Sequence, residues 1–371
     1  MATPEALWNE RTARLNAAIA LQTPDRTPVM SWCDAFCANH VGAPMSRFSQ
    51  EPLFATEVIA ESFARLPGFD GCERGTAIPD WLGAAFLSKV KVAGRDLPEG
   101  SPWNIDERER LAEGDYDRIA AGGWNAFFVE YCRERLDIDV PAFSEMRARA
   151  QEDCYRRMDA IGMPVYTVVI VPSSPLEPLS AGRSMAKFTR DLFRIPDRVQ
   201  AAMDAMMADF LAALRHALRS GARKPLTVFL GCARSSPEFL SPKLFDRFTW
   251  PYLRQTIDAV LAEGVVANLH LDTCWDRELE RFREFPKGSC LLATDYATDI
   301  RKAKQVLGDR MCIKGDVPSP LLAFGTPEEV RAYCRRLIED MGDGFILAPA
   351  CTMPANAKVE NVEAMLAAVH G

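Results

Sequence analysis

The sequence predicts a closed (β/α)8 barrel, in which eight parallel strands are followed by helices, with an irregular insertion after the second strand. Eight short apolar runs, of the kind that form buried strands, recur along the 371 residues, and nearly all precede a segment with helical spacing of its apolar residues. No Gly-x-Gly-x-x-Gly segment follows a strand, so a doubly wound dinucleotide fold is not indicated. In such a barrel the chemistry is placed at the carboxyl ends of the strands.

The first two strands lie near the N-terminus, and each follows a helix. An amphipathic pattern over 5–21 predicts the first helix, and the β-branched and apolar residues of 28–32 predict the first strand. A second helix is expected over 51–66, closed by Pro-Gly, and a second strand near 69–72.

Residues 73–163 interrupt this alternation with Gly, Pro, Trp and charged residues, and only a weak helix is indicated at 143–161. Long irregular stretches in compact domains are usually functional or disordered. The three tryptophans of this stretch argue against disorder: Trp81, Trp103 and Trp124. We expect a lid that closes over the barrel mouth and offers aromatic surface to a substrate, within a single barrel domain over 1–371.

After residue 163 strands and helices alternate regularly. The remaining strands are expected at 164–172, 226–232, 265–271, 289–294, 311–316 and 344–350. The helices are expected at 184–194, 196–219, 242–262, 275–284, 299–307, 326–341 and 358–369. The helix over 326–341 has the best-defined start, because Thr326-Pro327-Glu328-Glu329 has the form of a capping box with proline at the first helical position.

Composition narrows the classes of partner. The chain has 44 Lys+Arg against 51 Asp+Glu, and no basic run with interleaved aromatics, so we expect no nucleic acid partner. No segment approaches the ~18 consecutive apolar residues of a membrane span, and the N-terminus lacks a basic-then-apolar signal. The eleven scattered cysteines suit a reducing compartment. We therefore expect a cytoplasmic protein without a membrane partner.

Polar side chains follow several of the predicted strands. In chain order they are Cys33, Asp34, Asp80, Ser173, Ser174, Cys232, Arg234, His270, Asp272, Cys274, Asp295, Asp316 and Cys351. Asp80, Asp295 and Asp316 are candidate catalytic carboxylates. Arg234 and the insertion residue Trp81 are candidates for contact with a substrate.

The end of the fifth strand concentrates reactive groups. Residues i and i+2 of a strand point to the same side, so His270 and Asp272 are expected to face one space, where they can ligate a metal or act as acid and base. Cys351, at the end of the eighth strand, can complete a zinc site with an open fourth position. Cys274 is a rival for the thiolate. The alternative is structural: His270 as a core imidazole bonded to a carbonyl, and the two cysteines as small buried hydrophobes.

At these residues the chain resembles the uroporphyrinogen decarboxylase superfamily, most strongly after residue 180. The resemblance is found in Glu10-Arg11 with 24–28, Leu240-Ser241-Pro242 through Trp250-Pro251-Tyr252, 299–308, 313–317, 325–330, and 344–347 followed by Pro354 and Glu360-Asn361. Decarboxylases of this superfamily hold an acidic tetrapyrrole with an Arg-Gln-Ala-Gly-Arg segment after strand one. Here residues 31–37 contain no arginine, and Asp80 matches the decarboxylases' essential aspartate only loosely.

The resemblance is closer to the branch of zinc-dependent, corrinoid-linked methyltransferases, which bind zinc through a His-x-Cys element and a distant Cys. His270 and Cys351 match the outer positions, and Asp272 stands where that element has its Cys. The resemblance implies transfer of a methyl group between a corrinoid on a separate protein and a small donor or acceptor, and a possible homodimer. Two alternatives are a metal-free, decarboxylase-like lyase on a small substrate, with His270 as proton donor, and a scaffold protein that kept only the barrel.

Overall fold

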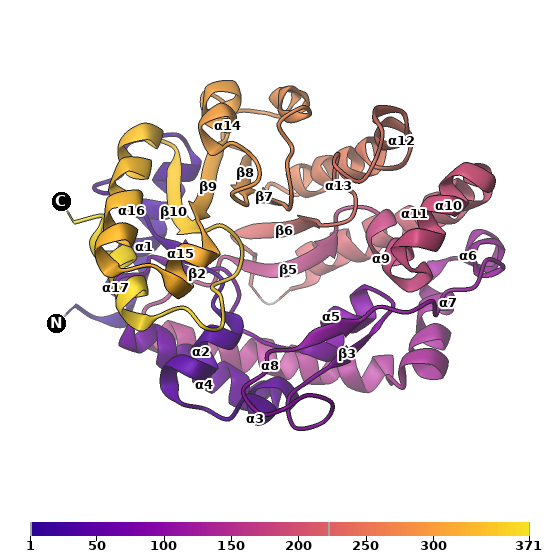
Figure 1. The fold of residues 1–371 in the computed structure, drawn as a ribbon, viewed down its shortest axis with the longest axis horizontal. Coiled ribbons are helices and arrows are strands. Elements are labelled where there is room, and N and C mark those ends of the chain that lie inside the picture. The colour runs from indigo at the N-terminus through magenta and orange to yellow at the C-terminus, as the bar shows by residue number, and fades with distance from the viewer. Residues whose placement is uncertain (1, 222, 371) are drawn as a thin grey trace.

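The computed structural model describes residues 2–221 and 223–370, in which eight parallel strands form a ring (Figure 1). These strands are β1 (Met30–Ser31), β2 (Gly71–Cys72), β5 (Thr167–Pro172), β6 (Thr227–Cys232), β7 (Val266–Leu271), β8 (Cys290–Thr294), β9 (Cys312–Val317) and β10 (Phe345–Pro349). All eight lie where the sequence predicts a strand, although β1 and β2 are shorter than expected.

The ring is closed by single bridges at β1 and β2. Strands β5 to β10 form one six-stranded parallel sheet, and β1 pairs with β2. A parallel bridge between Val29 and Leu347 joins β1 to β10, and one between Cys72 and Val165 joins β2 to β5. The predicted closed barrel of eight strands is therefore confirmed.

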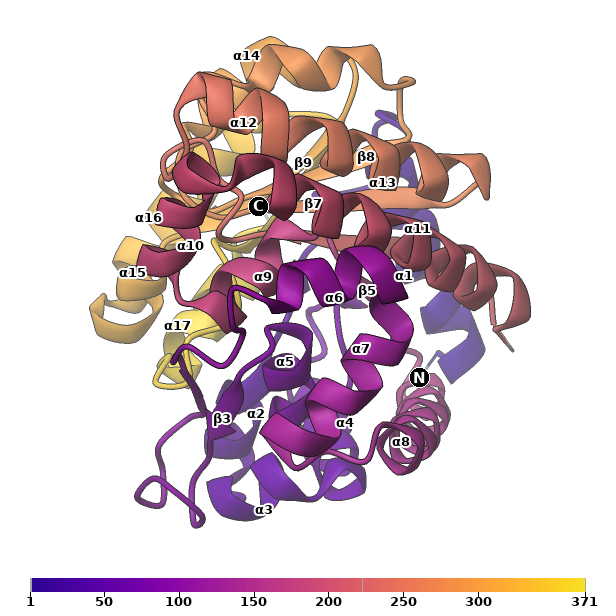
Figure 2. The same ribbon diagram turned by 90° about the vertical axis from the view of Figure 1, so that its right-hand side faces the viewer.

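Helices surround the ring and follow the strands, and Figure 2 shows α11 and α13 side by side on its outer surface. They are α1 (Pro4–Ile19), α2 (Asp34–Val41), α3 (Met45–Gln50), α4 (Pro52–Arg65), α9 (Leu176–Arg183), α10 (Met185–Arg194), α11 (Pro196–Ser220), α12 (Pro242–Phe248), α13 (Trp250–Ala262), the 3-10 helix η2 (Leu279–Glu284), α14 (Ile300–Leu307), α15 (Ser319–Phe324), α16 (Pro327–Met341) and α17 (Val359–Ala367). Among the residues described, none of the helices has both the length and the apolar character needed to span a membrane.

Two helix predictions were wrong in detail. The segment 242–262 is divided at Thr249, because α13 restarts with Pro251 in its first turn, and proline lacks the N–H that would continue the preceding helix. The segment 275–284 forms only η2. The backbone N–H of Trp275 donates to Thr298 (3.0 Å), and its indole N–H donates to the carbonyl of Asp272 (2.9 Å), so loop contacts hold this stretch outside a helix.

Residues 73–163 are more regular than predicted. Between β2 and β5 lie α5 (Pro79–Ala85), a hairpin of β3 (Lys89–Lys91) and β4 (Asn104–Asp106), α6 (Asp115–Gly122), α7 (Trp124–Tyr131), the π-helix η1 (Cys132–Leu136) and α8 (Val140–Ala160). Helix α8 confirms the weak signal at 143–161 and packs along α4, whereas α6 packs on α11. The insertion after the second strand is therefore present, but it is less irregular than expected, since most of its length is helical.

A buried carboxylate ties the N-terminal helix to the start of the barrel. Asp70 is fully buried and accepts hydrogen bonds from Arg14 (2.6 Å), Arg26 (2.8 Å) and the backbone N–H of Val29 (2.8 Å). Buried carboxylates are tolerated only when they are paired in this way. The network therefore fixes α1 against β1, the strand that closes the ring.

The barrel interior contains a polar layer below the site. Lys314 of β9 forms a buried ion pair with Glu73, which follows β2, and the amide of Asn268 on β7 donates to Glu73 at 2.7 Å. The hydroxyls of Thr167 and Thr227 lie 3.1 Å apart in the same layer. His270 is two residues beyond Asn268 on the same strand, so its side chain points into the barrel above this layer.

Candidate metal centre

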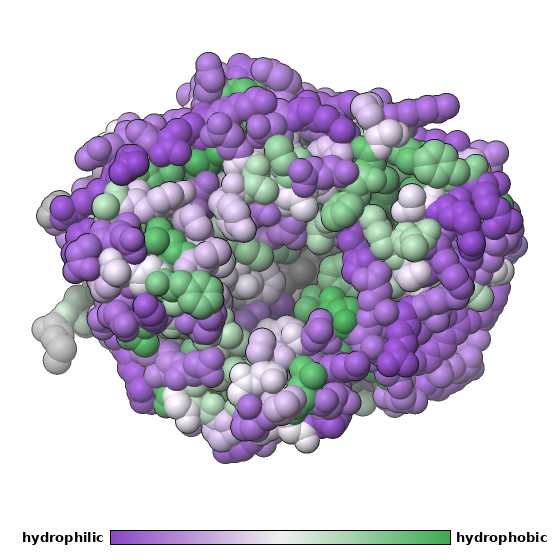
Figure 3. Space-filling model, in the orientation of Figure 1, coloured by the Kyte–Doolittle hydropathy of each residue, from purple (hydrophilic) through white to green (hydrophobic). Residues whose placement is uncertain are grey.

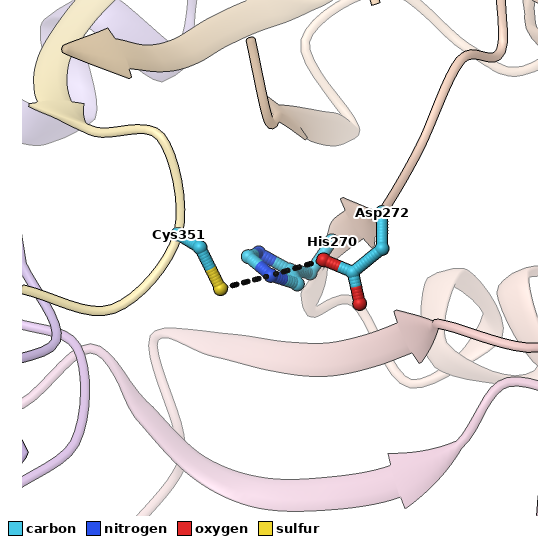
Figure 4. Close-up of side chains that lie close together, drawn as sticks. All are labelled: His270, Asp272 and Cys351. Carbon is cyan, nitrogen blue, oxygen red and sulfur yellow. Dashed lines mark hydrogen bonds and ion pairs between the residues drawn. The ribbon is translucent and has the colours of Figure 1, made fainter. Parts of the chain in front are cut away.

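Three donor side chains meet at the mouth of the barrel (Figure 4). His270 is near the end of β7, Asp272 follows that strand, and Cys351 lies on the loop after β10. The Nε2 atom of His270 is 3.2 Å from Oδ1 of Asp272 and 3.4 Å from Sγ of Cys351. All three donor atoms lie within 4.8 Å of one another. The structure thus brings together the three residues that the sequence proposed as ligands.

The chemistry of this donor set suits a cation. Two groups that bear negative charge when deprotonated converge on one imidazole nitrogen, which has at most one hydrogen to share between them. Donor atoms around one tetrahedral zinc, at bond lengths of about 2.0–2.3 Å, lie about 3–4 Å apart. The nitrogen of His270 is at such a separation from both the oxygen of Asp272 and the sulfur of Cys351, and all three atoms lie within 4.8 Å of one another, so these residues fit a zinc ion.

The imidazole is fixed by aromatic packing and surrounded by negative charge. Phe229 stacks on His270 with ring centroids 5.1 Å apart, and Trp32 packs edge-on against Phe229 at 5.4 Å. Among the described residues, Nδ1 of His270 has no hydrogen-bond partner. Burial favours the neutral ring, but Cys351 and Asp272 outweigh it and raise the pKa of His270 to about 10. The site therefore attracts positive charge at Nε2.

Exposure separates the two rival cysteines. Cys351 is exposed and belongs to the three-residue group, whereas Cys274 is half-buried and lies outside it. The other nine cysteines are buried. Cys274 is therefore the weaker candidate for a metal ligand.

This difference predicts the order of alkylation. Iodoacetamide is expected to modify Cys351 of the metal-depleted chain faster than Cys274 by roughly an order of magnitude, because access limits the reaction of a thiol. Peptide mass spectrometry over a time course measures both rates. Modification of Cys274 first would contradict this placement of the two thiols.

The three predicted catalytic carboxylates lie in different surroundings. Asp295, after β8, accepts hydrogen bonds from the backbone N–H groups of Thr273 (2.8 Å) and Ala297 (3.0 Å). Burial raises the pKa of Asp295, and the neighbouring charge of Asp272 acts in the same direction. Asp80 is half-buried on α5 and is paired with Arg95 at 3.1 Å. Of these two, only Asp295 adjoins the metal ligands.

The third carboxylate, Asp316 on β9, accepts a hydrogen bond from the hydroxyl of Tyr333 on α16 at 2.8 Å. Burial raises the pKa of Asp316 to about 6. Its partner belongs to the outer helix layer, so Asp316 is bonded away from the three-residue group.

The two predicted substrate residues are already engaged with the insertion. The guanidinium of Arg234 pairs with both carboxylate oxygens of Glu107 (3.1 and 2.9 Å), and its backbone N–H donates to the buried carboxylate of Glu177. Trp81 lies beneath the guanidinium of Arg147 (3.7 Å) and stacks on Phe143. Arg234 thus holds the loop after β6 to the insertion, whereas Trp81 faces a cavity.

Two adjoining cavities, which share Arg74 and Ile78 in their linings, lie between the barrel and the insertion. One of about 370 Å³ is lined by residues after β1, β2 and β10, together with Trp103 of the insertion. The other, of about 280 Å³, lies between the barrel and α8 and includes Trp81 and Thr167 in its lining. Figure 3 shows the molecule hollowed near the centre of one face, with apolar side chains bordering the hollow.

Two of the three tryptophans that were expected to offer aromatic surface lie at cavities, and the closing of a lid stays a prediction. Trp81 and Trp103 line the cavities, but Trp124 packs edge-on against Phe210 of α11, away from both. Sequence reasoning also missed Arg74 and Arg147, which line the smaller cavity. Arg74 follows β2 and could have been found among the strand ends, whereas nothing in the pattern of α8 marked Arg147.

The chain is similar to known proteins in sequence and in fold. Matching curated relatives are uroporphyrinogen decarboxylases, among them those of Chlorobium luteolum (26% identical over 108 residues, 28% of this chain and 29% of the relative) and Pseudoalteromonas translucida (23% over 195 residues, 51% and 53%). The match thus spans between about a third and half of the length of these relatives. A solved methyltransferase from Methanosarcina mazei superposes with a TM-score of 0.73 at 18% identity, covering 100% of this chain and 99% of that one, so the two share a fold.

The match to a family model is more extensive. The model described as Uroporphyrinogen decarboxylase (URO-D) matches residues 162–371, which is more than half of the chain and includes β5 to β10 with all three donor residues. The chain therefore belongs to the uroporphyrinogen decarboxylase (URO-D) family.

Proposed function

We propose that the chain is a zinc-dependent methyltransferase that moves a methyl group between a corrinoid on a separate protein and a small substrate. The observation that supports this most is the convergence of His270, Asp272 and Cys351 from two separate strands at the barrel mouth. A family fold shared with a solved methyltransferase is consistent with it. Demethylation of a methylated donor and methylation of a thiol acceptor are both compatible with the site.

Zinc in such a site supplies Lewis acidity, which makes a thiol more acidic or an ether oxygen a better leaving group. Stacking on Phe229 holds the His270 ring in position, so that Nε2 faces the other two donors. Cys351 is exposed and Asp272 is half-buried, so a substrate can reach the site from the mouth. The oxygen of Asp272, in place of a second thiolate, makes the site harder and more electrophilic.

Exposed aromatic side chains on segments that follow four of the strands support a protein partner. Segments that follow the ends of β5, β6, β8 and β9 expose Phe193, Phe239, Tyr296 and Phe324, the last with 75% of its surface accessible. Exposed aromatics of this kind are typical of protein-binding surfaces. We propose that the corrinoid protein binds over them, and that the chain works in the cytoplasm, where its eleven free cysteines stay reduced.

A methyl-transfer assay tests this function. The zinc-loaded chain is mixed with methylcobalamin and a panel of thiols, or with cob(I)alamin and a panel of methoxylated compounds, and the cobalt spectrum is followed. We expect transfer that disappears on chelation and returns with zinc. Methyl transfer that continues unchanged after chelation would exclude the zinc-dependent mechanism.

A metal-free lyase acting on a small carboxylic acid is the second candidate. It is supported by the decarboxylase relatives and by the position of Asp295 beside the site, where burial raises the pKa of this carboxyl and makes it a candidate for proton transfer to a substrate. Release of carbon dioxide by the metal-depleted chain, lost in Asp295→Asn, would support this candidate instead.

A further inference from the structure

Two arginines line the smaller of the two cavities. Arg74 follows β2 and Arg147 projects from α8. Within residues 2–221 and 223–370, neither guanidinium forms an ion pair with a carboxylate within 4.0 Å. Nearby arginines are paired, such as Arg95 with Asp80 and Arg157 with Asp153. The cavity therefore presents positive charge that the protein does not neutralise by direct contact.

Neither Glu73 nor Asp34 forms an ion pair with Arg74. Glu73, its neighbour in the chain, is committed to Lys314 and Asn268 in the barrel interior. Asp34 acts on Arg74 from the larger cavity but lies beyond ion-pair distance, and burial raises the pKa of Asp34 to about 6. Within the described residues no carboxylate is therefore in direct contact with Arg74, and an anion that enters the cavity can make that contact.

The two guanidiniums also act on each other. Burial, and then the positive charge of Arg74, lower the pKa of Arg147 to about 10. Holding two like charges at a partly enclosed site is unfavourable unless an anion lies between them. Planar guanidiniums match a carboxylate in geometry, since each can donate two parallel hydrogen bonds.

The remaining walls are aromatic and apolar. Trp81 lies under Arg147 at 3.7 Å, Trp32 lies under Arg74 at 5.4 Å, and Ile78 lines both cavities. A volume of about 280 Å³ is near the lower limit of small-molecule sites. A ligand that satisfies both features is small and combines an anionic group with an aromatic or apolar body.

The subsite is linked to the metal centre by ring contacts. Arg74 lies over Trp32, Trp32 packs on Phe229, and Phe229 stacks on His270. The cavity also reaches the barrel interior at Thr167, whose hydroxyl is 3.5 Å from the amide of Asn268. A ligand held by the arginines is therefore connected to His270 through a series of side-chain contacts.

We propose that Arg74 and Arg147 form an anion subsite that binds the carboxylate of a small aromatic acid against Trp81. Binding itself does not depend on the methyltransferase function. The role of this acid as the methyl donor or acceptor does rest on that function.

Binding is tested on the full chain without metal or corrinoid, by calorimetry and by tryptophan fluorescence. The probes are benzoate, the neutral isostere benzamide, and inorganic phosphate. We expect benzoate to bind at least tenfold more tightly than either of the other two, and Arg147→Met to weaken benzoate binding by about 10- to 100-fold, as for loss of a charged hydrogen-bond pair. Arg147→Lys should recover part of the loss.

Controls make the result specific. Arg149→Met removes the same charge from an exposed position of α8 and should leave benzoate affinity unchanged. Trp81→Leu should weaken benzoate more than acetate. Equal affinity for benzoate and benzamide, or unchanged binding in both Arg147→Met and Arg74→Met with folding intact by circular dichroism, would overturn the anion subsite. Tighter binding of phosphate than of benzoate would overturn the aromatic acid as its ligand.

Failure of the methyltransferase proposal can be distinguished from failure of the anion subsite. Benzoate binding that persists while no methyl transfer occurs leaves the subsite standing and removes only its catalytic role. Methyl transfer to or from neutral substrates that Arg147→Met does not change would show that the anion is not the substrate.

Discussion

Replacement of Cys351 by serine is expected to lower zinc affinity by at least about 100-fold, so that the purified variant holds far less than the one ion per chain expected of the parent protein. The side chain is exposed, so the substitution leaves no cavity and the melting temperature of the metal-free chain should stay the same. Elemental analysis after dialysis against a weak chelator measures the zinc content, and competition with a chromophoric chelator measures the affinity for zinc.

The controls separate the ligand from a bystander. His270→Ala should lose zinc as Cys351→Ser does, while Cys274→Ser, a matched change at a thiol outside the group, should retain it. If Cys274→Ser lost zinc and Cys351→Ser kept it, the site would be assigned to the wrong thiol. If neither variant differed from a parent protein that binds no zinc, the metal centre itself would be excluded.

Lys314→Met is expected to destabilise the fold by about 3–5 kcal/mol, the range for breaking one side of a buried ion pair. The side chains of Lys314 and Glu73 are only 5% and 4% exposed, so removal of the ammonium leaves a buried carboxylate without its counter-charge. Urea unfolding measures the loss. Lys89→Met is the matched control, because its pair with Asp137 is exposed and should contribute only about 0–1 kcal/mol.

The difference in stability between the parent protein and Lys314→Met should also depend on pH, which gives a second measurement. Burial alone would raise the pKa of Glu73, but Lys314 and His270 lower it below its ordinary value. Stability from the ionised Glu73 is therefore complete above the ordinary glutamate pKa of about 4.3, and is lost as pH falls through the lower value in the folded chain. In Lys314→Met, protonation removes the unpaired buried charge of Glu73 and so stabilises the fold. The difference in free energy of unfolding between the parent protein and this variant should therefore become smaller as the pH falls. A gap that widened would contradict the pairing.

A double variant tests why Lys314→Met is destabilised. Adding Glu73→Gln to Lys314→Met removes the unpaired charge while an amide oxygen can still accept from Asn268. This double variant should recover part of the lost stability. If it recovered none, the destabilisation would come from lost packing of Lys314 and not from the stranded carboxylate.

The barrel was predictable because its strands are buried on both faces and read as continuous apolar runs. Such runs located all eight strands, and alternation along β7 placed His270 and Asp272 on one side. The meeting with Cys351 across the barrel depends on ring closure, which no local pattern encodes, and was expected from the resemblance and from the convergence of strand ends.

Other features depend on tertiary contacts that leave little trace in the sequence. Helix α9 is buried along its whole length, including its polar residues Glu177, Ser180 and Arg183, so it does not have the exposed polar face of an amphipathic helix. The stretch after Trp275 is fixed by bonds to Thr298 and Asp272, which override its helical pattern. The proximity of Arg74 and Arg147 results from packing of α8 beside β2, two elements that are far apart in the chain.

The bridge between Val29 and Leu347 joins two positions that are far apart in the sequence. Because β1 precedes β10 by most of the barrel, β1 cannot gain this neighbour until β10 has been synthesised. Contacts of such long sequence separation form slowly, because the entropy of closing the loop must be lost before the contact is gained. Until then the Lys314–Glu73 layer is open to water, and the nascent chain exposes unpaired strand edges of the kind that chaperones protect.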